Sequence, residues 1–355
     1  MKIGLYDPYL DTLGGGEKYM LTAAECLAVK HEISFFWDDA TILEKVRSRF
    51  AIDTSHITTV PNVFTRKTSF FERIRQTKKF DTIIYLSDGS IPFVGSKKLF
   101  LHFQFPVEHI NGKTLLAKYK LQRVTGIICN SFFTKAYIDK TFDVVSTVLY
   151  PPASGEILSK SEKKENIILS VGRFNLLPDG TTFKKQEVLI EIFKKMIDKG
   201  LKDWKFILVV SYHEKDKAQR SFFAESIKNY PIEIYENLPS DKLKDIYEKT
   251  KIYWHAAGFD EDLKKHPERA EHFGIVTVQA MEKGAVPVVF DAGGQTEIVE
   301  KKCGFLWETK EELEEKTSAL INDESMWKKF SIQAKEDAKK FSKSVFCKKL
   351  YSVIE

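Results

Sequence analysis

Short β-rich runs alternate with longer amphipathic stretches along almost the whole chain. In the first half a helix-like stretch covers Lys18–Val29. The β-rich runs of this half are Lys2–Tyr6, Ile33–Trp37, Thr82–Leu86, Leu99–Phe103, Gly126–Cys129 and Val144–Leu149. Strands that alternate with helices predict parallel sheets with both faces covered. Since a single hydrophobic core stops growing at about 250 to 300 residues, the 355 residues of this chain predict two doubly wound α/β domains.

The alternation is interrupted once, near the middle of the chain. Tyr150, Pro151 and Pro152 end the first series, and the polar stretch Ser154–Glu165 follows them. Paired prolines and polar, charged stretches are typical of linkers between domains. The scheme then repeats, with strands expected at Asn166–Val171, Lys205–Val210, Ile232–Tyr235, Ile252–His255 and Val286–Phe290. The sequence therefore predicts one domain over residues 1–153 and a second that starts at residue 154.

Composition and charge exclude several classes of protein. No run approaches the roughly 18 apolar residues of a membrane-spanning helix, and the amino terminus has no apolar leader, so we expect a cytoplasmic protein. The four cysteines, Cys26, Cys129, Cys303 and Cys347, lie far apart and predict neither a zinc site nor a disulfide framework. The whole basic excess behind the net charge of +5 falls within residues 1–150, and it is too small for nucleic-acid binding.

Three glycine-containing turns are candidate anion sites. They are Gly14–Gly16 after the first strand, the segment Glu271–Met281, and Asp291–Glu297. In open α/β sheets ligands bind at the carboxyl ends of the strands, where loops lead into helix amino termini. Gly14–Gly16 alone matches no phosphate-binding motif and could be a flexible turn. Two such turns in adjacent units of the second half favour an anion site there.

Basic side chains near the same edge could offset the charge of an anion. Arg173 ends the first strand of the second half, and Lys184 and Lys185 precede the helix expected over Glu187–Ile197. Exposed Arg and Lys side chains usually do no more than solvate a surface. Their position after the carboxyl end of a strand favours a role in binding.

Several segments of the chain together resemble one enzyme family. These segments are NSFFTKAYI, VLYPP, GRF, KKQEVLIEIF, YWHAAGF and EHFGIVTVQAMEKGAVPVVFDAGGQTEIV. With them the chain is similar to the retaining GT-B glycosyltransferases of family 4, most of all to bacterial and archaeal relatives of the enzymes that mannosylate dolichol-linked oligosaccharides. The resemblance covers nearly the whole chain and is strongest from Ile127 to Val299.

The resemblance implies a fold and a division of labour. It implies the GT-B architecture, two doubly wound, Rossmann-like parallel-sheet domains that face a cleft. Residues 1–153 would form the acceptor-side domain and 154–341 the nucleotide-sugar donor domain, with 342–355 crossing back to the first.

The resemblance also implies roles for individual residues. Arg173 and Lys184 would hold the donor diphosphate, with Lys185 in reserve if the register is shifted by one. Glu271 would contact the donor sugar as the first acid of the family's Glu-x7-Glu motif. The remaining implied positions are Phe273, Gly274 and Ile275 at the phosphate-facing turn, Gly15 and Gly16 against the donor phosphates, and His102 in the cleft. A buried core histidine is the alternative for His102, and His255 is equally open to a structural role or a place lining the cleft.

One position departs from the family pattern. The second acid of the motif falls at position 279, where this chain has Gln279. A carboxylate can accept hydrogen bonds from both ribose hydroxyls, whereas an amide has a single acceptor oxygen. We therefore expect weaker or altered donor binding, and a nucleotide-sugar-binding protein with little or no transferase activity is the alternative function.

The reaction that we expect is same-face transfer from a nucleotide-diphospho-sugar, either GDP-mannose or a UDP-sugar. The leaving diphosphate would accept the proton of the acceptor hydroxyl, and Arg173, Lys184 and the helix amino terminus near Gly274 would offset its charge. No further cofactor and no metal are expected, because Arg173, Lys184 and the helix amino terminus would already neutralise the diphosphate. A phosphorylase or an epimerase on paired α/β domains is a rival, and the phosphorylase would need a lysine-bound pyridoxal cofactor.

The expected acceptor is a glycan or a lipid-linked sugar. Residues 65–80 carry basic side chains interleaved with Phe70, Phe71 and Ile74. Such a segment can lie on an anionic membrane surface and make the enzyme a peripheral one. A solvated helix over a small core is an equally good interpretation.

Overall fold

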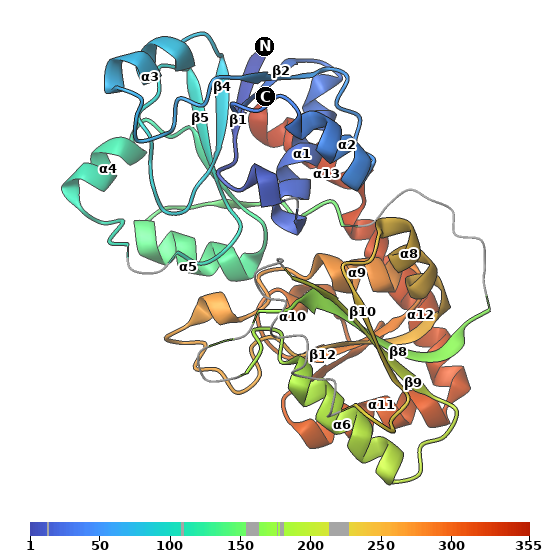
Figure 1. Ribbon diagram of the computed structural model, residues 1–355. Helices are drawn as coiled ribbons and strands as arrows, with labels where there is room; N and C mark the ends of the chain where they lie inside the picture. Colours follow the sequence, from blue (N-terminus) through green and yellow to red (C-terminus); the bar gives the residue numbers. More distant parts are fainter. Residues whose placement is uncertain (13, 108–109, 154–162, 176, 178–180, 213–226) are drawn as a thin grey trace. The chain divides into compact units, whose positions relative to one another are not determined.

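The computed structural model describes residues 1–355 except 13, 108–109, 154–162, 176, 178–180 and 213–226. Its contacts divide the chain into two units (Figure 1). Unit 1 comprises Met1–Pro152 with Lys343–Glu355, and unit 2 comprises Ala153–Ser342. The sequence-based boundaries were 1–153 with 342–355, and 154–341. The acceptor-side and donor-side roles of the two units stay predictions.

Unit 1 is built on a seven-stranded sheet with the order β3-β2-β1-β4-β5-β6-β7. All of its strand pairs are parallel. The central strands are almost wholly apolar and buried, as expected for strands covered on both faces. The strands are β1 Lys2–Tyr6, β2 Glu32–Phe36, β3 Ile57–Val60, β4 Thr82–Leu86, β5 Lys98–Phe103, β6 Gly126–Cys129 and β7 Thr147–Val148.

Helices cover this sheet, and side-chain caps fix where several of them begin. The hydroxyls of Ser69, Thr114 and Ser131 accept hydrogen bonds from the N–H groups three residues later. The helices are α1 Gly15–Ala28, α2 Ile42–Phe50, α3 Phe70–Thr77, α4 Leu115–Leu121, α5 Phe132–Phe142 and α13 Lys343–Ile354, with the short 3₁₀ turn η1 at Leu10–Thr12.

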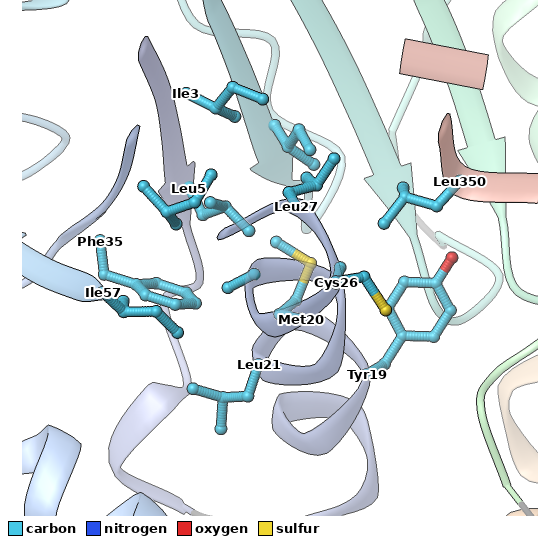
Figure 2. Close-up of a cluster of buried hydrophobic side chains, with 14 of the residues drawn as sticks. Ile3, Leu5, Tyr19, Met20, Leu21, Cys26, Leu27, Phe35, Ile57 and Leu350 are labelled. Atoms are coloured by element: carbon cyan, nitrogen blue, oxygen red, sulfur yellow. The ribbon is translucent and has the colours of Figure 1, made fainter. Parts of the chain in front are cut away.

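The last helix of the chain completes the core of unit 1. Phe346, Leu350 and Ile354 of α13 are buried in the same cluster as Ile3 and Leu27. Figure 2 shows Leu350 of this helix beside residues of α1 in that cluster. Because α13 contributes to a core that is otherwise built from residues 1–152, unit 1 is discontinuous in sequence.

A disulfide joins Cys26 of α1 to Cys347 of α13, with the two Cα atoms 5.5 Å apart. The sequence-based expectation of no disulfide was wrong in this respect. The two residues are 321 positions apart, and only the return of α13 to unit 1 brings them together. The other two cysteines, Cys129 and Cys303, are free and buried.

Unit 2 repeats the plan with a six-stranded sheet of order β10-β9-β8-β11-β12-β13. Its strand pairs are again all parallel, so their carboxyl ends share one edge. The strands are β8 Glu165–Arg173, β9 Lys205–Ser211, β10 Ile232–Glu236, β11 Thr250–His255, β12 Val286–Phe290 and β13 Phe305–Trp307.

The helices of unit 2 cover both faces of its sheet (Figure 1). The highly charged segment 311–355 contains separate helices, of which only the last belongs to unit 1. The elements are α6 Gln186–Asp198, α8 Ser240–Lys249, η3 Pro267–Arg269, α9 Ile275–Glu282, α10 Gln295–Ile298, α11 Lys310–Asn322, α12 Glu324–Ala338 and η4 Lys339–Phe341. Among the residues that the structure describes, no helix is both long and apolar enough to cross a bilayer.

Candidate functional site

The candidate site of unit 2 lies at the carboxyl edge of its sheet. β8 ends at Arg173, β11 ends at His255, and β12 leads into the turn that contains Gly293. Helix α9 begins at Ile275 on the same side, since it follows the loop after β11. A helix that starts there leaves its first backbone N–H groups without partners inside the helix. This edge therefore combines cations, a carboxylate and a helix amino terminus.

Lys184, His255 and Glu271 form a compact hydrogen-bonded cluster. Lys184 Nζ lies 2.7 Å from Glu271 Oε2, and His255 Nε2 lies 2.8 Å from the same oxygen. The His255 side chain is 3% exposed, while those of Lys184 and Glu271 are 20% and 16% exposed. The lysine and the glutamate therefore remain open to a ligand, and the histidine supports the glutamate from inside.

The protonation of the cluster follows from its contacts. Burial alone would raise the pKa of the Glu271 carboxyl, but the charge of Lys184 and the hydrogen bond from His255 hold it well below its ordinary value. Burial lowers the pKa of His255 despite the neighbouring carboxylate. A neutral His255 next to a carboxylate must carry its proton on Nε2, which leaves the buried Nδ1 as an unpartnered acceptor.

Glycines bring the neighbouring turns into contact with this cluster. The N–H of Gly294 donates to the carbonyl of Glu271 at 2.7 Å, and a Cβ on Gly293 would lie 2.2 Å from that carbonyl oxygen. Gly274 caps α9 with φ at +116°, a conformation that only glycine adopts readily. Phe341 of η4 packs edge-on against Phe273, so this turn has a further contact within unit 2. The Phe273–Ile275 turn is thus held rigidly beside Glu271.

Lys184 packs against the backbone of β8 directly before Arg173, which brings the two residues close together. A Cβ on Gly172 would lie 3.1 Å from Lys184 Cγ, so the lysine stem runs along the strand just before the exposed Arg173. The structure therefore brings both sequence-predicted cations to one strand end. Gln279 lies on α9, half-buried, one turn beyond the start of that helix.

Lys185 has a different environment from Lys184. Its Nζ lies 2.5 Å from Glu261 Oε1, with both side chains 6% exposed, and Arg269 binds the other oxygen of Glu261. Burial raises the pKa of Glu261, but the two cations outweigh that effect and lower it. Lys185 thus ties the start of α6 to the loop after β11. The structure assigns Lys184, rather than its neighbour, to Glu271.

The glycine-rich turn of unit 1 forms the start of α1. Gly14 caps the helix, and its N–H donates to Glu17 Oε2 at 2.6 Å. The Gly16 carbonyl accepts a hydrogen bond from Gln104 Nε2, and a Cβ on Gly16 would lie 2.2 Å from Gln104 Oε1. Gly15 is the first helical residue. The sequence did not single out Gln104, although it follows β5 at the same sheet edge.

Asp7 is a second residue near this turn that the sequence-based reasoning missed. It follows β1, is 1% exposed, accepts a hydrogen bond from the N–H of Tyr9, and has a buried Oδ2 without a partner. Burial, with smaller contributions from Glu17 and Asp11, raises the pKa of its carboxyl to about 7. Its position directly after a central strand could have drawn attention to it.

His102 has the surroundings of a core histidine. Its ring is 1% exposed, stacks on Tyr19 with centroids 4.2 Å apart, and places Nδ1 3.3 Å from the Ile128 carbonyl. Burial lowers the pKa of its ring to about 3, so the ring is neutral. These contacts favour the structural alternative over direct contact with a substrate, and its catalytic role stays a prediction.

Within the described parts of the chain, no group of three or more His, Cys, Asp or Glu side chains is arranged to bind a metal ion. Positive groups at the carboxyl edge of the sheet in unit 2 are Lys184, Arg173 and the amino terminus of α9.

Comparison with known sequences identifies related proteins. The family model described as "Glycosyl transferases group 1" matches residues 156–337. Among curated proteins, the GDP-Man:Man(3)GlcNAc(2)-PP-Dol alpha-1,2-mannosyltransferase of Neurospora crassa is 23% identical over 276 residues, which cover 65% of this chain and 45% of that protein. The match thus spans less than half the length of this relative.

Solved structures resemble the chain over almost its full length. Anabaena HepE in complex with UDP has a TM-score of 0.73 at 18% identity, with 99% of both chains covered. A glycosyltransferase from Rickettsia africae has a TM-score of 0.73 at 17% identity, covering 99% of this chain and 97% of that one. At such identities the likeness concerns the fold, and it confirms the two-domain α/β GT-B fold expected from the sequence.

Proposed function

The chain belongs to the glycosyl transferases group 1 family, and on this premise we propose that it moves a hexose from a nucleotide-diphospho-sugar to a glycan or lipid-linked acceptor hydroxyl, with retention of configuration. The observation that carries the proposal is the Lys184–Glu271–His255 cluster beside the amino terminus of α9. It joins a cation for the diphosphate to a carboxylate for the sugar at one sheet edge.

The chain's own groups account for the charge that develops on the leaving diphosphate. As the bond between the sugar and the diphosphate breaks, negative charge grows on the diphosphate oxygens. Arg173, Lys184 and the first N–H groups of α9 oppose that charge. Lys184 has three N–H donors, so it can keep its contact with Glu271 while it reaches a phosphate oxygen.

In the proposed step the leaving diphosphate accepts the proton of the acceptor hydroxyl. The acceptor oxygen bonds to the anomeric carbon on the face that the diphosphate leaves, and its proton passes to a diphosphate oxygen. No protein nucleophile and no metal ion takes part in the proposed step. Glu271, ionised because Lys184 and His255 lower its pKa, can accept hydrogen bonds from donor-sugar hydroxyls.

The identity of the donor is part of the proposal. GDP-mannose and UDP-sugars are the two candidates, since the Neurospora crassa relative is named for GDP-Man and the HepE structures contain UDP and UDP-glucose. Gln279 offers one amide oxygen to the ribose where a carboxylate would offer two. We therefore expect donor affinity to depend more on the diphosphate contacts than on the ribose.

Substitution of the two cations tests the proposal. Arg173→Ala and Lys184→Ala should each lower kcat about 10² to 10³-fold, as loss of one charge-stabilising group typically does. Lys328→Ala is a matched control, because this exposed lysine lies on α12. Turnover is measured with a panel of nucleotide sugars that are first ranked by thermal shift.

Two results would contradict the proposal. Near-normal turnover in both variants would remove the two cations from the mechanism. Thermal stabilisation by a nucleotide sugar, with no transfer to any acceptor or to water, would favour the alternative of a binding protein with little activity.

A further inference from the structure

Two short helices of unit 1 expose large apolar side chains. Phe70 and Phe71 of α3 and Leu115, Leu116 and Tyr119 of α4 are all more than half exposed, with Phe71 at 83% and Leu115 at 88%. Exposed apolar residues scattered singly are normal on a protein surface, but a group of them on neighbouring elements marks an interaction site. We call these five residues and Phe93 the α3–α4 surface.

The α3–α4 surface is continuous. The ring centroids of Phe70 and Phe93 are 5.9 Å apart, and those of Phe93 and Tyr119 are 6.2 Å apart. Phe93 therefore bridges the two helices, which lie beside each other at one flank of unit 1 (Figure 1). Phe71 extends the surface further, because its ring contacts the ring of Phe70 edge-on. The four rings thus form one series of contacts, and Leu115 and Leu116 lie about one helical turn before Tyr119 on α4.

The two segments that carry α3 and α4 are rich in basic residues and contain almost no acidic ones. Residues 65–80 contain six Lys or Arg and a single acid, Glu72, while residues 111–123 contain four Lys or Arg and no acid. Glu72 is itself paired with Arg75. The basic residues are Arg66, Lys67, Arg73, Arg75, Lys78 and Lys79 on the first segment, and Lys113, Lys118, Lys120 and Arg123 on the second.

The charges are placed to act together with the apolar side chains. Lys120 Nζ lies over the ring of Phe93, 5.2 Å from its centroid. Lys67, Lys78, Lys79 and Lys118 are exposed, so their charges are available to a partner. A partner that complements this surface must be anionic and must also accept aromatic and aliphatic side chains into an apolar interior. A bilayer with anionic headgroups meets both requirements.

We infer that the α3–α4 surface binds anionic phospholipid bilayers, with Phe71, Leu115 and Leu116 entering the acyl boundary and the surrounding lysines and arginines contacting headgroup phosphates. The surface includes α4 in addition to the segment 65–80 that the sequence indicates. This inference goes beyond the proposed sugar transfer and does not depend on it, because binding to a bilayer is measured without any donor or acceptor.

Vesicle sedimentation of the full chain tests the inference. The wild-type protein should sediment with vesicles of 70% phosphatidylcholine and 30% phosphatidylglycerol and stay in solution with pure phosphatidylcholine. Phe71→Ser combined with Leu115→Ser should lower the partition coefficient roughly tenfold or more. Lys78→Gln combined with Lys118→Gln should lower it by a similar factor, since each basic residue near an anionic surface contributes roughly fivefold.

The chain offers matched controls for both double variants. Val145→Ser with Ile332→Ser removes two exposed apolar side chains, 90% and 66% exposed, that lie outside the α3–α4 surface. Lys328→Gln with Lys329→Gln removes two lysines of α12. Neither control should change the partition coefficient. The thermal midpoints of all four variants should match the wild-type value, because the substituted side chains are exposed.

Several outcomes would overturn the inference. Equal partition onto the two vesicle compositions would remove the charge complementarity on which it rests. An equal loss in the control variants would show that the α3–α4 surface is not the contact. A dimer that Phe71→Ser with Leu115→Ser converts to monomer, in the absence of vesicle binding, would make a second copy of the chain the occupant.

Discussion

At the scale of single residues, neighbours in sequence have separate tasks in this protein. Lys184 contacts the half-buried Glu271, whereas Lys185 is locked in a buried pair with Glu261. The residue pattern placed both lysines before α6, and only the family resemblance favoured Lys184 over Lys185, because the choice depends on where the loop after β11 comes to lie. The left-handed backbone at Lys185, with φ at +53°, turns the two side chains apart.

Asp7 gives a prediction at the same scale. Its folded pKa of about 7 lies above the ordinary value of 3.8. Between pH 4 and 7 the unfolded chain loses this proton first, so the free energy of unfolding falls as pH rises, by on the order of 4 kcal/mol for three units. Asp7→Asn keeps a side-chain oxygen that accepts the hydrogen bond from the N–H of Tyr9. It should make the free energy of unfolding depend less on pH and should raise it at pH 8. Urea denaturation at pH 4.5, 6 and 8 measures the effect.

The control for Asp7→Asn is an aspartate on the surface. Asp245→Asn, at an exposed position of α8, should leave the pH profile of the free energy of unfolding as it is in the wild-type protein. If the profile of Asp7→Asn followed the wild-type curve, the Asp7 carboxyl would have to be ionised in the folded state at pH 6.

At the scale of elements, strongly patterned segments were predictable, among them the edge strand β10, expected at Ile232–Tyr235 and observed at Ile232–Glu236. The other edge strands, β3, β7 and β13, were missed or given the wrong length. The helix expected to begin near Gly274 occupies Ile275–Glu282, and the strand expected over Val286–Phe290 has those bounds. The strand expected over Val144–Leu149 pairs only at Thr147–Val148, on the edge of the sheet. β3 was missed because its four residues lie at the opposite edge and alternate weakly. A strand with one neighbour needs less of the apolar pattern by which buried strands are recognised.

The cap of α9 provides a prediction for an element. In Gly274→Ala the alanine would have to adopt a φ of +116°, and its Cβ would lie only 2.8 Å from Gln295 Nε2. We expect the free energy of unfolding to fall by about 1 to 3 kcal/mol. Nucleoside diphosphate affinity should also fall at least tenfold, because the first N–H groups of α9 are displaced. Calorimetric titration and urea denaturation measure the two effects.

Gly200 supplies the control for this substitution. It has a similar φ of +103°, but nothing lies within 4 Å of the Cβ position. Gly200→Ala should therefore be destabilised by backbone strain alone and should bind the nucleotide as the wild-type protein does. If Gly274→Ala and Gly200→Ala bound the nucleotide with equal affinity, the amino terminus of α9 would not be part of the anion site.

At the scale of the whole molecule, the pairing of Cys26 with Cys347 could not be foreseen from spacing. It depends on the return of the last helix to the first unit, across 321 positions of sequence. The two-domain plan, in contrast, was readable from the repeated strand–helix alternation and from the break near Pro151. Local patterns predict elements and their order, but a single distant contact depends on the assembled fold.

Counting thiols tests this pairing. The denatured, unreduced protein should show two free thiols, those of Cys129 and Cys303, and four after reduction. Removal of the disulfide by Cys26→Ser with Cys347→Ser should cost about 2 to 5 kcal/mol of stability in unit 1. Cys129→Ser alone should leave the disulfide intact and lower the unreduced count to one. Four free thiols in the untreated protein would contradict the pairing.

The place of α13 in unit 1 has a consequence for how the protein is made. Phe346, Leu350 and Ile354 fill the core of unit 1, yet they are synthesised after the whole of unit 2. Unit 2 is continuous and can fold while synthesis proceeds, but the interior of unit 1 stays incomplete until residues 343–355 have been made. A stop codon directly after residue 342 would therefore damage the half of the protein that is synthesised first.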